Sequence, residues 1–144
     1  MGIKKLPPIE KVYESWTALA DHRVKMHEGY ADVSSSDGEK AYVVRFVDNR
    51  YSSDDNATFW QGYPGYPVLA VMMLQGKLPY DEKEAQLWKN INWTRLNKQY
   101  KNNYAKAVEA IAQERDIDLG ESADKASQVI DALQQLPIEI KRKI

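Results

Sequence analysis

Cysteine is absent from this chain of 144 residues. Its absence excludes a disulfide framework, zinc sites built on thiolates and catalysis by a cysteine nucleophile, and it is consistent with a reducing compartment. Histidine is scarce as well, and the two histidines, His22 and His27, lack the i, i+4 spacing of a helical metal pair. We therefore expect neither a metal ion nor a cofactor.

An excess of charge is also missing, because the formal net charge is −1. A chain so nearly neutral has no overall attraction to nucleic acid or to an anionic membrane. The N-terminal sequence MGIKKLPPIE lacks the apolar stretch of a signal peptide, and the apolar run from Val68 to Leu74 is far shorter than the roughly 20 residues that cross a bilayer. The sequence therefore predicts a cytoplasmic protein without a membrane span.

Catalytic and phosphate-binding motifs are missing too. No serine is framed by glycines as in a nucleophile elbow, and no GK[ST] loop occurs. The polar residues from Asp48 to Asn56 do not match an EF-hand, because Arg50 stands where an oxygen ligand belongs. The function must therefore be argued from surfaces and side-chain clusters.

The strongest feature that is present is the apolar segment ending at Gly76. Pro67 suits the first turn of a helix and Gly76 suits the position after its end, so the pattern predicts a buried helix from Pro67 to Gln75. Another helix is predicted from Pro8 to Val24, where apolar residues recur at helical spacing. These residues are Ile9, Val12, Tyr13, Trp16, Leu19 and Ala20.

Two strands joined at Asp37-Gly38 are predicted next, because this pair favours a tight hairpin turn. If Asp37 and Gly38 form the two-residue loop, three pairs of cross-strand partners lie on one packed face: Val33 and Tyr42, Ala31 and Val44, Gly29 and Phe46. The other face is half polar. Residues 48–58 are rich in turn-formers and predict a loop, whereas Ile138 to Lys141 alternates after Pro137 and is a candidate edge strand.

Further helices are predicted from capping residues. Asp81 and Glu84 match a capping box that begins a helix from Glu82 to Ile91. Asn92 can cap a long helix from Trp93 to about Arg115 with one apolar and one basic side. The apolar side comprises Trp93, Leu96, Tyr100, Tyr104, Ala107, Val108 and Ile111. Residues 118–122 break this helix, and a last one begins at Ser122 with the apolar face Ala126, Val129, Ile130, Leu133 and Leu136.

The fold class follows from this order of elements. We expect one α+β domain over residues 1–144, predominantly helical with about five helices, a small antiparallel β-hairpin and a candidate third edge strand at the C-terminus.

A binding surface is the functional hypothesis that the residues favour. The glycine- and proline-rich segment before the apolar helix carries Trp60, Tyr63 and Tyr66, and the preceding loop brings Arg50 and Tyr51. Aromatic rings are enriched at interfaces, and at least one of the three should stand at the surface. The sequence thus suggests a non-enzymatic binding or accessory module whose partner is another protein or a second copy of the chain.

Two alternatives remain open. A small hydrolase-like enzyme would assemble its site from scattered carboxylates, tyrosines and His22 or His27, and would show a concave site where titratable groups converge. A weak nucleic-acid binder would use the basic helix face of Arg95, Lys98 and Lys106. The pattern argues against nucleic acid, because the tyrosines of that helix belong to its apolar side.

Overall fold

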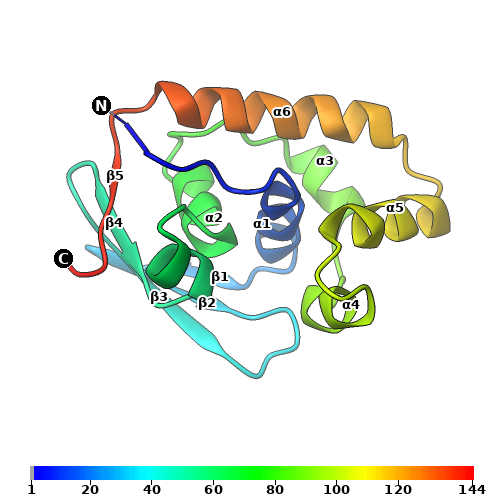
Figure 1. Cartoon of the computed structure of the whole chain (residues 1–144), viewed down its shortest axis with the longest axis horizontal. Helices are drawn as coiled ribbons and strands as arrows, with labels where there is room; N and C mark the ends of the chain where they lie inside the picture. The colour runs from blue at the N-terminus through cyan, green and yellow to red at the C-terminus, as the bar shows by residue number, and fades with distance from the viewer. Residues whose placement is uncertain (1) are drawn as a thin grey trace.

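The computed structural model describes residues 2–144 and shows one α+β domain in which helices pack on a five-stranded sheet (Figure 1). The helices are α1 (Glu10–Ala20), the short π-helix η1 (Ala57–Gln61), α2 (Tyr66–Leu74), α3 (Glu82–Leu87), α4 (Trp93–Gln99), α5 (Tyr104–Arg115) and α6 (Leu119–Gln135). The strands, in spatial order, are β1 (Val24–Met26), β2 (Tyr30–Ser34), β3 (Ala41–Val47), β4 (Arg50–Ser53) and β5 (Glu139–Ile140). The predicted α+β class is confirmed, with more strands than expected.

The elements form three layers. Figure 1 shows α6 along one side, α1 and α2 in the middle, and the sheet on the other side. Helix α2 contacts β1, β3 and β4, while α1 contacts α2 and α6. The core therefore lies on both sides of the α1–α2 layer. Within residues 2–144, no helix is both long and apolar enough to cross a membrane.

The predicted central helix is confirmed as α2. Val68, Leu69 and Met72 are completely buried, as expected for a helix that is apolar on all sides. Gly76 follows the helix with φ +76°, a conformation that costs glycine little. Both α2 and the turn that follows it at Gly76 are therefore determined by local signals in the sequence.

The first helix is confirmed but ends earlier than predicted. Helix α1 stops at Ala20, His22 has a left-handed φ of 56°, and Val24 already belongs to β1. Val24 pairs with Val33 on β2. The tail of the predicted helix is therefore a strand, because backbone pairing with the hairpin replaces the helical hydrogen bonds.

The predicted hairpin register is present in β2 and β3. Ala31 lies opposite Val44, Val33 lies opposite Tyr42, and the Gly29 carbonyl accepts a hydrogen bond from the Phe46 N–H at 3.1 Å. Ala31, Val33 and Val44 are completely buried beneath the helices. A one-residue slip would turn this apolar set outward, so burial and turn select the same register.

The predicted loop over residues 48–58 is wrong. Its centre is strand β4, which pairs antiparallel with β3, and its end leads into η1. Tyr51 explains the difference, because its ring is completely buried opposite Phe46. The candidate C-terminal strand is confirmed as β5, which runs parallel to β4 and forms the edge of the sheet.

The predicted long helix from Trp93 to Arg115 is also wrong. It divides into α4 and α5, because Lys101 and Asn102 have positive φ values of 52° and 63°. The Asn103 side chain then accepts a hydrogen bond from the Lys106 N–H at 3.2 Å and caps α5. Asparagine tolerates the left-handed conformation and competes with helical hydrogen bonds, which favours a break here.

Capping at the other helices is mostly as predicted. The Asp81 carboxylate accepts from the Glu84 N–H at 3.1 Å, and Asn92 caps α4 through the Arg95 N–H at 3.0 Å. Helix α3 nevertheless ends at Leu87, short of the predicted Ile91.

The helix break predicted at residues 118–122 lies earlier, at Asp116, which follows α5 with a left-handed φ of 57°. Asp118 caps α6 by accepting from the Glu121 N–H, so the helix begins before Ser122. The predicted apolar face holds, with Ala126, Val129 and Leu133 buried.

Candidate functional site

A polar cleft of about 160 Å³ opens between α1, the β2–β3 hairpin, the start of η1 and α4. Figure 1 shows α4 beside the hairpin turn. The Thr94 N–H donates to Ser36 Oγ at 3.1 Å, which ties α4 to the turn, and Trp93 Nε1 donates to Thr17 Oγ1 of α1 at 2.8 Å. These bonds hold elements that are distant in sequence around one concavity.

Two charged side chains of α1 lie in the cleft. Lys11 Nζ is 3.3 Å from Glu14 Oε2, and the two side chains are 12% and 7% exposed. Burial raises the pKa of Glu14, although the charges of Lys11 and Arg23 oppose the effect. Burial tends to lower the pKa of Lys11, but Glu14, Tyr104 and Tyr63 together outweigh it and the net pKa is raised. Lys11 therefore stays charged at neutral pH and pairs with a carboxyl group whose pKa is raised.

Arg23, just after α1, is the second cation of the cleft. Its Nη1 donates to the Ser34 carbonyl at 2.5 Å. Its Nε and Nη2 are buried and have no hydrogen-bond partner among residues 2–144, since the nearest carboxylate oxygen, Asp21 Oδ2, lies 3.8 Å from Nε. Asn97 Oδ1, on α4, is likewise buried without a partner in the described chain. Such groups are uncommon in folded proteins.

Two tyrosines form another wall. The rings of Tyr42 and Tyr66 meet edge to face, with centroids 6.3 Å apart. Burial raises the pKa of both phenols, and the nearby charge of Arg23 only partly offsets this for Tyr66. Both hydroxyls therefore remain protonated at neutral pH and can donate hydrogen bonds.

Asp55 fixes the floor of the cleft. Its carboxylate accepts hydrogen bonds from the Ser53 hydroxyl, and from the Thr58 N–H and hydroxyl at 3.1 Å each. The Thr58 hydroxyl in turn accepts from the Gly65 N–H at 2.9 Å. This network joins the end of β4 to η1 and to the start of α2, so Asp55 has a positioning role.

The residues predicted to form a binding surface do not converge. Tyr66 lines the cleft. Tyr51 is completely buried and its hydroxyl donates to Gln75 Oε1 at 2.6 Å, so it is not accessible to a partner, which corrects the prediction for that residue. Arg50 is exposed on β4, opposite Glu139 of the edge strand.

Trp60 and Tyr63 do not line the cleft, although Tyr63 lies near Lys11. Trp60 is 64% exposed and packs edge to face on Phe59, with the Arg142 guanidinium 5.4 Å from each ring centroid. Tyr63 is half-buried below Lys5. At least one ring of the aromatic segment is therefore at the surface, as expected, but the three rings form no single patch.

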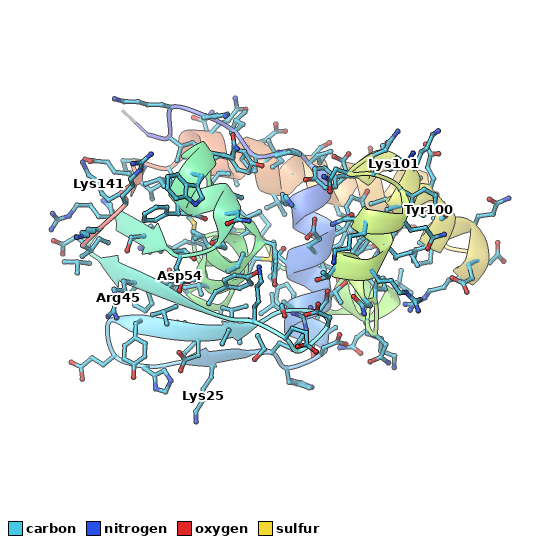
Figure 2. The ribbon with its side chains drawn as sticks, turned by 60° about the horizontal axis from the view of Figure 1, so that its bottom comes forward. Lys25, Arg45, Asp54, Tyr100, Lys101 and Lys141 are labelled. Carbon is cyan, nitrogen blue, oxygen red and sulfur yellow. The ribbon has the colours of Figure 1, made fainter. Side chains whose placement is uncertain are left out.

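The basic residues are exposed as predicted, although the helix break divides them. Arg95 and Lys98 belong to α4, whereas Lys106 belongs to α5. Figure 2 shows Tyr100 and Lys101 at this break, at the opposite end of the molecule from Lys141. Tyr100 is half-buried and does not belong to the fully buried core.

The histidines do not line the cleft. His22 is exposed, and His27 contacts Asp32 through Nε2 at 2.9 Å while stacking on Tyr30. In the part of the chain that the structure describes, no group of three or more histidines, aspartates and glutamates is placed to hold a metal ion.

Several cleft residues were missed by sequence reasoning. Lys11 and Glu14 look like an ordinary i, i+3 pair on a helix surface, and Arg23 was assigned to the end of that helix. Asn97 lies in the sequence between the exposed basic residues Arg95 and Lys98. The only available signal was Glu14 itself, a carboxylate one position from the apolar stripe of α1, and it was too weak to mark a site.

These features define the chain as an α+β domain with a polar cleft built from buried, oppositely charged groups. The chain belongs to the family described as Uncharacterised conserved protein UCP014422, whose model matches residues 4–139. The matched range contains all the residues that line the cleft. No curated protein and no solved structure matches the chain.

Proposed function

We propose that this protein is a binding module that takes a small polar molecule into the cleft between α1, the hairpin and α4. The observation that carries this proposal is the pair of buried, unpartnered N–H groups of Arg23 in a concave site. A buried polar group without a partner costs about 1–3 kcal/mol. A ligand that supplies the missing acceptors would recover this free energy.

The size of the cleft limits the ligand. Pockets for drug-sized molecules typically occupy about 300–1,000 Å³. The cleft offers about 160 Å³, which suits a molecule of few heavy atoms. Its walls combine the Lys11–Glu14 pair with the protonated hydroxyls of Tyr42 and Tyr66, so polar ligands are favoured over apolar ones.

A small hydrolase-like enzyme is the second candidate, and Glu14 is the observation that favours it. A buried carboxyl group with a raised pKa can act as a general acid. Neither histidine lines the cleft, so such an enzyme would work through Glu14 and the tyrosines. Finding converted ligand after incubation with the protein would separate an enzyme from a binder.

A thermal-shift screen of small carboxylates, phosphates, amines, amides and polyols tests the proposal. A ligand that binds the native state should raise the unfolding temperature, and the shift should grow with the logarithm of the ligand concentration once the site is saturated. Ala57→Leu, which narrows the cleft, should abolish the shift, whereas Ala105→Leu on the exposed face of α5 should not. The proposal fails if no class produces a shift, or if the shift persists in Ala57→Leu.

A further inference from the structure

The free edge of the Arg23 guanidinium has a specific geometry. Because Nη1 is engaged by the Ser34 carbonyl, the groups left without a partner in residues 2–144 are Nε and Nη2. These two N–H groups point in parallel from one side of the planar guanidinium. That spacing matches the two oxygens of a carboxylate, which can accept both hydrogen bonds at once.

The carboxylates in and beside the cleft each have another partner, although Asp21 also forms a long ion pair with Arg23. Asp21 Oδ1 accepts from the Asn90 N–H at 2.8 Å, while its other oxygen stays 3.8 Å from Arg23 Nε. Asp55 is held by Ser53 and Thr58, and Glu14 is paired with Lys11. The Nε and Nη2 groups of Arg23 therefore keep unused hydrogen-bonding capacity, as does Asn97 Oδ1, although the Tyr66 hydroxyl lies close to the guanidinium.

The surroundings of Arg23 favour a ligand with one anionic group and, next to it, a neutral group that donates a hydrogen bond. Glu14 is paired with Lys11 at 3.3 Å, which offsets its charge within the cleft and reduces repulsion of an incoming anion. Asn97 Oδ1 is an acceptor, buried and unpartnered within the described residues, so it can receive a hydrogen bond from an O–H or N–H of the same ligand.

We infer that the ligand is a small carboxylic acid bearing a hydroxyl or amine group, with its carboxylate bound side-on by Nε and Nη2 of Arg23 and its donor group facing Asn97. This inference rests on the proposed function of the cleft. A carboxylate fits better than a phosphate, because one guanidinium edge offers two donors and the other cation, Lys11, is already paired.

Binding of matched probes tests the inference. Glycolate and lactate should bind in a saturable manner, and should shift the NMR signals of the Asn97 side-chain amide and the Trp93 indole. Their neutral amides, glycolamide and lactamide, should bind at least about tenfold more weakly, because they lose the charge-assisted pair of hydrogen bonds. Inorganic phosphate should bind more weakly than either carboxylate.

Two substitutions in the cleft, each with a control, distinguish the contacts. Arg23→Lys keeps the positive charge but loses the two parallel N–H donors of the guanidinium, and should weaken lactate binding about tenfold or more. Arg45→Lys on the outer face of the sheet (Figure 2) should leave binding unchanged. Asn97→Asp should weaken lactate binding by repulsion without touching Arg23, whereas Asn102→Asp at the exposed α4–α5 connection should not.

The outcomes separate this inference from the function on which it rests. Lactate binding that is unchanged in both Arg23→Lys and Asn97→Asp overturns the inference, as does phosphate binding that is equal or tighter. Binding of amides or amines instead, lost in Ala57→Leu, overturns the carboxylate assignment but retains the cleft as a ligand site. If none of the compounds binds, both proposals fall.

Discussion

At the scale of the residue, the cleft depends on Gly65, where the structure leaves no space for a side chain. Gly65 lies next to the Asp55 carboxylate, and a Cβ atom there would overlap Asp55 Oδ2 and lie 3.1 Å from the Ala57 Cβ. The carboxylate is held in place by Ser53 and Thr58, so it has little room to move. The close contact between the Gly65 backbone and the Asp55 carboxylate thus helps to hold the floor of the cleft in place.

Gly65→Ala should therefore lower the free energy of unfolding by about 2 kcal/mol, the range expected for overpacking. Gly120→Ala is the matched control, since its Cβ would meet its nearest neighbour, Asp118 Oδ1, at 3.4 Å in the first turn of α6. There alanine should be neutral or slightly stabilising. Urea unfolding of both variants measures the difference, and equal stabilities would show that the contact at Gly65 relaxes freely.

At the scale of the element, the division into α4 and α5 is set by asparagine chemistry. Asn103 caps α5, and the left-handed residues before it turn the chain. This turn places α5 against α1, where Ala107, Val108 and Ile111 are buried, while α4 stays beside the hairpin. In a continuous helix, α4 and α5 could not contact the hairpin and α1 at the same time.

Asn103→Ala should remove the cap and lower the free energy of unfolding by about 1 kcal/mol. Gln99→Ala, at an exposed position near the end of α4, is the control and should have little effect. Chemical denaturation measures both. A loss of the same size in the control would mean that the cap contributes no more than any exposed polar residue.

At the scale of the whole molecule, buried tyrosines should control stability in alkali. Burial raises the pKa of Tyr13 to about 12, and it also raises the pKa values of Tyr42 and Tyr66. Their stabilising contribution is complete below the unfolded pKa of about 10 and is lost as the pH rises through the folded values. The free energy of unfolding should therefore fall progressively above about pH 10.

Unfolding in urea between pH 8 and pH 11 tests this dependence. Tyr66→Phe should make the decline shallower, because it removes one hydroxyl that ionises at lower pH in the unfolded chain than in the folded protein. Tyr30→Phe, on the outer face of the sheet, is the control and should keep the slope of the wild type. A slope that is unchanged in Tyr66→Phe would assign the alkaline loss to other groups.

The sequence by itself determined the elements that local signals define. The apolar run specified α2, the Asp-Gly turn and alternation specified the hairpin register, and Asp81 and Asn92 marked helix starts. Each of these signals acts over a few neighbouring residues, so it can be recognised without knowing the rest of the fold.

Only the tertiary structure decided strand β4 and the cleft. Tyr51 looks like a loop residue until α2 and β3 bury its ring, and Val24 becomes a strand residue only by pairing with Val33. Arg23 and Asn97 are far apart in sequence and line one cavity because α4 is tied to the hairpin turn and to α1. Burial and pairing between distant segments have no local signature, which is why the site became visible only in three dimensions.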